Sequence, residues 1–467
     1  MRQELFIKDP EDLSAIKQNY REKMKDREFR IQICSGAGCV SSNCRAVKEA
    51  LVKCLEEEGL SDKVIGAETG CIGTCDLGPV MVVTALKDGK GVFYTKLTPR
   101  DIPAIVASHL ISGKIKYDRT YFDRKLGRNI PYINEIDYFK NQVKIALRNC
   151  GSIDYASLED YIANDGYLSF AKVLKEYTPE QAVDEIKKSG LRGRGGAGFP
   201  TGVKLESGMK APGGEKYLVC NADEGDPGAF MDRSILEGDP NSVIEGMLIG
   251  GYAIGAHKGF VYVRAEYPLA VERLDMAIGN ARKAGLLGEN IFGGGFGFDI
   301  EIRIGAGAFV CGEETALMAS IEGERGEPRQ KPPFPFQKGL FGKPTIICHV
   351  ETYANIPPII LHGGSWFSGY GTEDSRGTKV FALAGAINNT GIVEVPMGTT
   401  LGNIIFNIGG GIRKNKGFKA AQTGGPSGGC ITRENLNTPM DYDSLVKLGA
   451  IMGSGGLITM DEDTCMV

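Results

Sequence analysis

The sequence lacks any apolar run near the roughly 18 residues that a membrane-spanning helix needs. It also lacks the apolar core of a signal peptide, because charges of both signs alternate through its first 30 residues, MRQELFIKDPEDLSAIKQNYREKMKDREFR. These absences exclude a membrane-embedded chain and a secreted one. We therefore expect a soluble cytoplasmic protein.

A long basic segment is also missing. Lys and Arg number 54 against 58 Asp and Glu, which gives a formal net charge of -4 and no surface suited to phosphate backbones. Nucleic acid is therefore not an expected partner. With 467 residues, of which 42% are hydrophobic, the chain is long enough for several domains with buried cores.

Cysteine and glycine are abundant. Twelve cysteines in a reducing compartment, several in short-spaced pairs, favour metal ligation over disulfides. The 65 glycines are about twice the usual share, which indicates many tight turns or close approaches of the backbone to ligands.

The N-terminal part predicts a small sheet that carries four of these cysteines. The order helix, strand, helix, strand, two paired strands and helix is that of a thioredoxin-like sheet. Cys34 ends the first strand, Cys39 follows it, and Cys71 and Cys75 lie in a glycine-bearing loop. Four thiolates on two loops suit zinc or an iron–sulfur cluster, and simple burial of the thiols is the structural alternative.

Two other cysteines of this part have different expected roles. Cys54 belongs to an apolar helical stripe and is expected in the core. Cys44 is either an unused neighbour of the four cysteines or an alternative ligand.

A glycine-rich loop, LRGRGGAGFPTGVKLE, spans residues 191–206, and Gly193, Gly195 and Gly198 spell G-x-G-x-x-G. A dinucleotide fingerprint must follow a strand, whereas residues 178–189 predict a capped helix that ends at Gly190. The loop is nevertheless suited to wrap a phosphate or a flat ring, with Arg194 as its positive charge.

Carboxylates follow two predicted strands. The strand KYLVC runs into NADEGDPGAF, and an alternating strand over residues 298–304 precedes a helix that begins near Glu313 and Glu314. Ligands bind at the carboxyl edge of open α/β sheets. A solvated acidic turn, or simple stabilisation of the helix N-terminus, is the structural alternative.

Together, GLRGRGGAGFPTG, NADEGDPGAF, CGEETAL, KPPFP, GKPT and VETYANIP resemble the NADH-binding flavoprotein subunit of respiratory complex I and its soluble relatives in NAD-linked hydrogenases and formate dehydrogenases. The resemblance covers essentially the whole chain. It implies FMN in a Rossmann-like domain and hydride transfer from NADH to the flavin without a side-chain acid or base. The implied cofactor-binding residues are Gly193, Arg194, Gly195, Phe199, Lys204, Asn221, Asp223, Glu224, Asp226, Gly312, Glu313, Glu314, Lys331 and Phe334.

The cysteine pattern C-x4-C followed by C-x3-C resembles the thioredoxin-like 2Fe-2S ferredoxins of NADH dehydrogenases. This resemblance implies that Cys34, Cys39, Cys71 and Cys75 hold a 2Fe-2S cluster. The fused cluster domain, together with Asp226 where the respiratory subunit has Glu, resembles the hydrogenase-type branch, which includes electron-bifurcating enzymes.

Several positions depart from the family pattern. Leu205 and Ser207 replace two aromatic residues after Lys204, and Phe309 replaces a tyrosine. Cys348 and His349 replace a pair of asparagines, so two amide partners of the flavin are lost. A metal held by Cys348 and His349 alone is disfavoured, because two ligands are too few.

Four domains are expected. They are a thioredoxin-like 2Fe-2S domain (1–115), a Rossmann-like FMN and NADH domain (116–345), a β-grasp domain (346–435) and the truncated start of a helical 4Fe-4S domain (436–467). The C-x2-C-x2-C motif of that last domain is absent from the sequence, so a 4Fe-4S cluster is expected only in a missing C-terminal extension.

Two main hypotheses for the function remain at this point, beside a third in which the chain is a zinc-binding interaction module. The first is an NAD(P)H:acceptor oxidoreductase, or diaphorase, subunit. It passes electrons through FMN to iron–sulfur clusters, with a small 2Fe-2S subunit, a hydrogenase or formate dehydrogenase subunit and ferredoxin as partners. The second is a paralogue with a degenerate nucleotide site that serves as a 2Fe-2S electron relay and scaffold.

Overall fold

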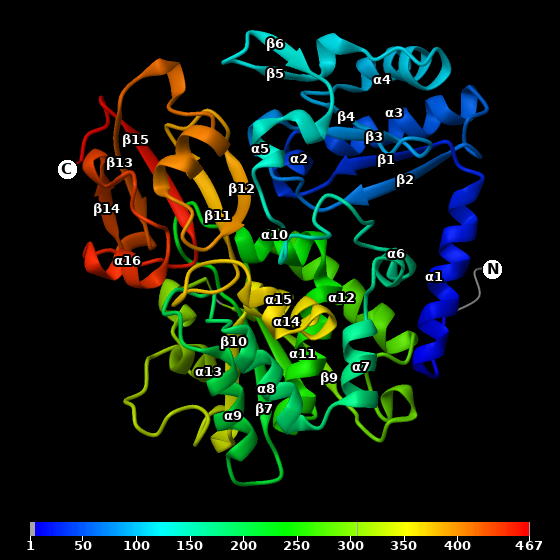
Figure 1. Ribbon diagram of the computed structural model, residues 1–467. Coiled ribbons are helices and arrows are strands. Elements are labelled where there is room, and N and C mark those ends of the chain that lie inside the picture. Colours follow the sequence, from blue (N-terminus) through cyan, green and yellow to red (C-terminus); the bar gives the residue numbers. More distant parts are fainter. Residues whose placement is uncertain (1–4, 306, 467) are drawn as a thin grey trace.

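Three sheets and a short hairpin make up the computed structural model, which describes residues 5–305 and 307–466 (Figure 1). The first four residues of the expected first domain and residue 467 of the expected last one lie outside this description. In Figure 1 the first sheet lies at the upper right, the third at the upper left and the second below them.

The first sheet has the strand order β2-β1-β3-β4, in which β1 pairs parallel with β2 and antiparallel with β3. This mixed order agrees with the predicted thioredoxin-like sheet. Its elements are α1 (Pro10–Lys25), β1 (Phe29–Cys34), α2 (Ala37–Ser41), α3 (Cys44–Glu57), β2 (Val64–Thr69), β3 (Met81–Ala85), β4 (Gly91–Tyr94) and α4 (Ile102–Ile105).

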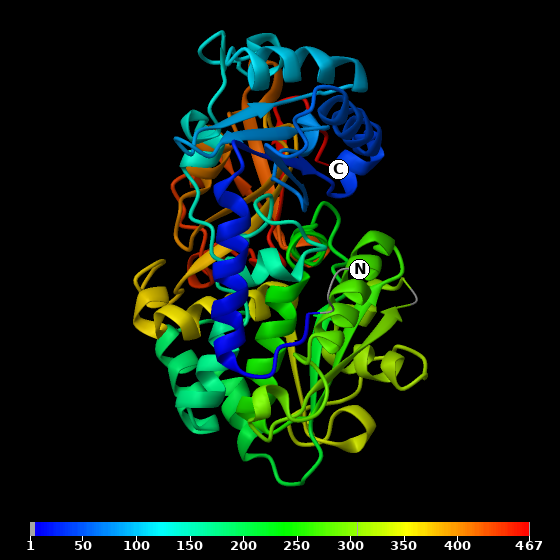
Figure 2. The ribbon, with the colours of Figure 1, turned by 90° about the vertical axis from the view of Figure 1, so that its right-hand side faces the viewer.

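Helix α1 begins directly after Asp9, because Asp9 and Asp12 form a capping box and Pro10 is the first helical residue. It packs against α6 (Leu158–Ala163) and α7 (Leu168–Glu176), which belong to the unit built around the second sheet. Figure 2 shows α1 running along the molecule from the unit of the first sheet to this second unit.

The second sheet is fully parallel, with the order β10-β7-β8-β9. Leu218 and Cys220 of β7 face the large core around α11 and α14, and Val219 faces the smaller core with Leu317 of α13. Elements up to α10 are α6 (Leu158–Ala163), α7 (Leu168–Glu176), α8 (Pro179–Ser189), α9 (Thr201–Lys210), β7 (Tyr217–Ala222) and α10 (Met231–Gly238). They are followed by α11 (Pro240–Ile254), β8 (Lys258–Arg264), α12 (Pro268–Lys283), β9 (Asp299–Gly305), α13 (Glu314–Ile321), β10 (Thr345–His349), α14 (Val350–His362) and α15 (Gly364–Ser368).

The direction in which successive strands are added to this parallel sheet reverses once. The chain proceeds from β7 through β8 to β9 and then returns to place β10 on the other side of β7, so the strand order switches between β7 and β10. In open α/β sheets, ligands bind outside the carboxyl ends of the strands at such a switch. The sheet therefore places a candidate site at Asn221 and His349, which are partners in the β7–β10 register.

The third sheet has the order β12-β11-β15-β13-β14, with a parallel β11–β15 pair between two antiparallel hairpins. This is the arrangement expected of a β-grasp domain. Its elements are β11 (Thr378–Gly385), β12 (Gly391–Pro396), a helical turn (Asn403–Ile408), β13 (Phe418–Thr423), β14 (Gly429–Thr432), α16 (Tyr442–Lys447) and β15 (Gly456–Asp461).

Three expected boundaries change. Residues 436–467 do not begin a separate helical domain, because β15 pairs with both β11 and β13 inside the third sheet. The boundary at 345/346 would detach β10, which pairs with β7, so the second unit extends through α14. The boundary at 115/116 would detach the hairpin of β5 (Tyr121–Asp123) and β6 (Arg128–Ile130), whose flanks bridge to β4 at Val92 and Tyr94.

The first and third sheets share one hydrophobic core. Tyr138, just after the hairpin in α5 (Asp137–Lys140), donates its hydroxyl to the carbonyls of Gly73 and Ile392, at 2.7 and 2.9 Å. The hydroxyl of Tyr138 therefore links the loop that carries Cys71 and Cys75 to β12 by hydrogen bonds. Within the described part of the chain, no helix is long and apolar enough to cross a membrane.

Candidate functional site

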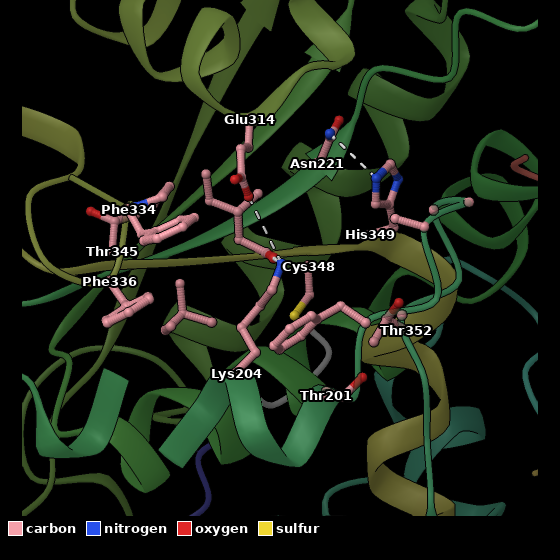
Figure 3. Close-up of a pocket in the computed structure, with 18 of the residues that line it drawn as sticks. Thr201, Lys204, Asn221, Glu314, Phe334, Phe336, Thr345, Cys348, His349 and Thr352 are labelled. Carbon is pink, nitrogen blue, oxygen red and sulfur yellow. Dashed lines mark hydrogen bonds and ion pairs between the residues drawn. The ribbon is translucent and has the colours of Figure 1, made fainter. Parts of the chain in front are cut away.

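A cavity of about 560 Å³ opens at the carboxyl edge of the parallel sheet, at the switch between β7 and β10 (Figure 3). This volume lies within the range of small-molecule and cofactor sites, about 300–1,000 Å³. Ten predicted site residues line it, namely Gly193, Gly195, Phe199, Lys204, Asn221, Gly312, Glu313, Glu314, Lys331 and Phe334. The predicted glycine loop and the predicted strand-end residues thus meet at one cavity.

The glycine-rich loop follows a helix, as the sequence predicts, and the structure adds a second helix directly after it. Helix α8 ends at Gly190, which has a left-handed backbone (φ 65°), and α9 begins directly after Pro200. A Cβ on Gly195 would lie 1.9 Å from Cδ2 of His349, so only glycine allows the imidazole to lie against the loop. The loop therefore holds His349 in the cavity wall.

His349 lies between two polar partners. Its Nδ1 is 3.5 Å from a carboxylate oxygen of Asp232, and its Nε2 is 3.5 Å from the amide nitrogen of Asn221 (Figure 3). Asn221 also donates to the carbonyl of Gly312 at 2.9 Å. The imidazole, which replaces an expected amide, thus presents a polar ring to the cavity beside Asn221.

Two lysines and two glutamates form a charged wall of the cavity. Lys331 lies 3.0 Å from Glu313 and 2.7 Å from Glu314, and Lys204 lies 3.9 Å from Glu314. Glu313 also caps α13 by accepting backbone N–H bonds from Thr315 and Ala316. Helix capping therefore accounts for the position of Glu313. The ion pairs with the two lysines hold both carboxylates at the cavity.

Four expected residues do not line the cavity. The Arg194 guanidinium donates to the carbonyls of Arg192, Arg376 and Thr378 and is 1% exposed, so it joins the loop to the third sheet. Asp226 accepts a hydrogen bond from the hydroxyl of Ser454 at 3.2 Å. Asp223 and Glu224 are buried outside the cavity lining.

These last two carboxyl groups have raised pKa values. Burial raises the pKa of Asp223 to about 6, against the opposing charge of Arg264. Burial also raises the pKa of Glu224 to about 8, even though the backbone N–H groups of Met231 and Asp232 donate to it. Glu224 thus organises the start of α10 from within the core.

The cavity fits a flavin mononucleotide in two respects. At Gly193 the glycine loop leaves a surface without side chains, because a Cβ there would meet only the backbone of Phe199 within 4 Å, and this suits a flat ring or a phosphate. A buried polar atom without a hydrogen-bond partner among the described residues also remains in the cavity lining, Oγ1 of Thr201 at the start of α9. Buried polar atoms are normally hydrogen-bonded, so such atoms point to a ligand.

Sequence reasoning missed several lining residues. Thr201 belongs to the glycine-loop motif, and its place directly after Pro200 at a helix start is a signal that could have identified it. Thr352, whose hydroxyl accepts the backbone N–H of Arg194, carries no comparable local signal. Neither do Ile347 and Phe336, because they reach the cavity only through the β10 register and the loop before it.

The four predicted cysteines lie next to one another at the end of the first sheet. The Cys71 and Cys75 sulfurs are 3.8 Å apart, and the thiols of Cys39 and Cys71 hold the pKa of Cys34 well below its usual range. Glycines make this packing possible, since a Cβ on Gly78 would lie 2.9 Å from the Cys39 sulfur. The sulfurs thus form a continuous group.

This group of four thiols suits a 2Fe-2S cluster. A 2Fe-2S cluster takes four thiolates spread over two irons. Cys44 and Cys54 are buried on α3 in the hydrophobic core, as predicted for Cys54.

Helix α10 connects the cavity with the cysteines. Asp232 in its first turn faces His349, and Glu237 in its last turn accepts the backbone N–H of Ala37, between Cys34 and Cys39. Gly238 lies so close to Gly70 that a Cβ on Gly70 would be 2.1 Å from the Gly238 Cα. Eight helical residues span about 12 Å, so the two sites lie at opposite ends of one short helix.

Comparison with known proteins agrees with this geometry. Residues 186–358 match the family described as the Nuo51 FMN-binding domain, and residues 18–109 match the thioredoxin-like [2Fe-2S] ferredoxins. The chain is 63% identical over 328 residues to the NADP-reducing hydrogenase subunit HndC of Solidesulfovibrio fructosivorans, an alignment that covers 70% of this chain and 66% of the relative. It is 46% identical over 323 residues to an NADH-quinone oxidoreductase subunit of Rhizobium meliloti, with 69% of this chain and 77% of the relative covered.

A solved structure extends the likeness to the whole fold. An NAD⁺-reducing [NiFe]-hydrogenase in the air-oxidised state superposes with a TM-score of 0.58 at 26% identity, covering 97% of this chain and 73% of that one. The chain therefore belongs to the family that unites the FMN-binding subunits of NADH-quinone oxidoreductases with related subunits of NAD- and NADP-reducing hydrogenases, and it carries an FMN-binding domain and a thioredoxin-like [2Fe-2S] domain.

Proposed function

We propose that this chain is the NAD(P)H-oxidising flavoprotein subunit of a multisubunit redox complex of the hydrogenase or formate dehydrogenase type. The observation that carries the proposal is helix α10, which joins the cavity at His349 directly to the loop of Cys34 and Cys39. Electrons that enter at the cavity thus have an acceptor in the same chain, at the far end of a helix about 12 Å long.

The cavity residues bind and orient the reactants. The glycine loop and Thr201 hold the FMN, and Asn221 and His349 form its polar edge. Phe199 and Phe334, exposed at the mouth and about half accessible, offer apolar faces to the nicotinamide nucleotide. Bound there, FMN supplies the ability to take two electrons from the nicotinamide and release them one at a time. No side-chain acid or base is required.

The partners follow from the same proposal. The relatives are named as subunits of hydrogenases and of NADH-quinone oxidoreductase. We assign to this chain a small 2Fe-2S subunit and a hydrogenase or formate dehydrogenase subunit as partners, with ferredoxin as a further electron carrier.

The test uses the purified full chain. Flavin absorbance should bleach on anaerobic addition of NADH or NADPH, and the reduced protein should give the electron paramagnetic resonance spectrum of a 2Fe-2S cluster. A protein that contains iron and sulfide but still binds no flavin after reconstitution with FMN would contradict the proposal.

The variant Gly195→Ala sharpens this test. Its new methyl group would displace the His349 ring into the cavity, so we expect at least a tenfold loss of FMN affinity, about 1.4 kcal/mol. Gly279→Ala, which adds a methyl group on α12 with no atom within 4 Å, is the matched control. Fluorescence titration with FMN measures both, and equal affinities would place the flavin elsewhere.

One observation favours the second hypothesis, an electron relay without flavin. His349 already occupies the space above Gly195 that a flat ring would share. Under this hypothesis neither variant binds FMN, and the cluster is reduced by a protein donor but not by NADH. Hydrogen exchange over residues 193–207 separates the two, because only the flavoprotein gains protection there when FMN and NADH are added.

A further inference from the structure

Two buried, oppositely charged side chains of the second unit hold the loop of Cys34 and Cys39. Arg273 of α12 donates to the carbonyl and hydroxyl of Ser35, at 2.6 and 2.9 Å, and to the carbonyl of Glu237 at 2.6 Å. Glu237 accepts the N–H of Ala37 at 2.9 Å. Arg273 and Glu237 are 2% and 1% exposed.

Support of the loop alone does not explain these charges. Burying a guanidinium or a carboxylate costs several kcal/mol, and neutral groups would supply the same hydrogen bonds. Among the described residues, Nε of Arg273 keeps no hydrogen-bond partner, and Oε1 of Glu237 has only Nε of Arg233 near it, at 3.6 Å, which is an ion pair without a hydrogen bond. The Arg273 guanidinium is fixed further by stacking 3.7 Å above the ring of Tyr155.

The position of the charges relative to the cysteines suggests their role. Ser35 directly follows Cys34, and Ala37 lies between Cys34 and Cys39, so both charges reach the backbone of the ligand loop. Reduction adds one negative charge to a cluster, and charges in a poorly screened interior act on it strongly. A fixed guanidinium therefore favours the reduced cluster, and a fixed carboxylate opposes it.

We propose that Arg273 and Glu237 are positioning residues that set the reduction potential of the 2Fe-2S cluster in opposite directions from within the flavin-binding unit. The inference deepens the proposed function, because Glu237 lies in the last turn of the helix whose first turn faces His349 in the cavity, and Arg273 binds the carbonyl of Glu237. It concerns the cluster alone and does not depend on the flavin.

The experiment is a redox titration of the full chain with dithionite and mediators, followed by electron paramagnetic resonance of the cluster. Arg273→Met should lower the midpoint potential, Arg273→Lys should keep it close to that of the wild type, and Glu237→Gln should raise it. Arg282→Met removes a half-exposed charge from the same helix, where Arg282 pairs with Asp299, and should leave the potential unchanged.

The sign of the shifts decides the outcome. A loop that is merely loosened would shift the potential in the same direction in Arg273→Met and Glu237→Gln, and this result would overturn the proposal. So would an assembled cluster in Arg273→Met with the wild-type potential. If Arg273→Met does not assemble a cluster, an unchanged or lower midpoint potential in Glu237→Gln would overturn the proposal. A wild-type chain with a cluster but no flavin would contradict the proposed function and leave this inference standing.

Discussion

Single residues around the cavity show how far local sequence signals reach. Thr178 was identified as the N-terminal cap of α8 and Gly190 as its C-terminal cap, because capping depends on neighbours within one turn. Arg194 was expected at the cofactor because it lies in the glycine loop, but its partners are carbonyls at the start of the third sheet. The direction in which a long side chain points depends on groups that are distant in sequence.

Glu224 provides a prediction at this scale. Its pKa is raised from 4.5 to about 8 in the folded chain, so the folded state binds an extra proton between these pH values. Stability from this group is complete below about pH 4.5 and is lost as the pH rises through 8. The free energy of unfolding should fall by up to about 1.4 kcal/mol per pH unit through this window on account of Glu224.

The variant Glu224→Gln should flatten that slope, whatever its effect on absolute stability. Urea denaturation at about pH 5.5 and about pH 7.5 measures the slope for wild type and variant. Glu327→Gln, which alters a side chain that is 64% exposed, is the control and should retain the wild-type slope. A Glu224→Gln protein with the wild-type slope would contradict the raised pKa.

Among the elements, β15 departs most from expectation. Its residues were assigned to the start of a helical domain from the resemblance to relatives that continue into a helical bundle, and a short apolar segment has no periodicity that would have corrected this assignment. Its partners β11 and β13 lie tens of residues earlier, and only the folded sheet reveals the gap between them that β15 fills. By contrast, β1, β7 and β9 were located from alternation or apolar runs alone.

Leu457 tests this placement. It is fully buried on β15 in the core shared by the first and third sheets, so Leu457→Ala should cost about 2–5 kcal/mol. Val446→Ala on α16, where the side chain is 66% exposed, should change stability by less than about 0.5 kcal/mol. Urea unfolding compares the two, and equal midpoints would show that β15 is not part of the sheet.

At the scale of the whole molecule, the first and third sheets are in direct contact, and this contact determines how the units open. The first and third sheets share a core, and Tyr138 joins the loop of Cys71 and Cys75 to β12 through two carbonyls. The cluster-binding unit is therefore expected to open together with the third sheet and not as an independent domain.

The variant Tyr138→Phe removes the hydroxyl and should cost about 1–3 kcal/mol. Hydrogen exchange followed by mass spectrometry should show faster exchange in both residues 71–75 and residues 391–396. Tyr117→Phe, at a side chain that is 55% exposed, should leave both segments unchanged. Faster exchange in only one of the two segments would show that the units open separately.

The sequence by itself determined the elements whose signals are local: the capped helices, the alternating strands, the four cysteines at loop ends and the glycine loop that follows a helix. These elements depend on contacts within a few residues, so the order of the amino acids is enough to predict them. Only the tertiary structure decided that β10 returns beside β7 and brings His349 to Asn221, that β15 completes the third sheet, and that α10 joins the cavity to the cysteines. Each of these depends on the packing of segments far apart in the chain, where the burial of side chains, and not local backbone preference, selects the partner.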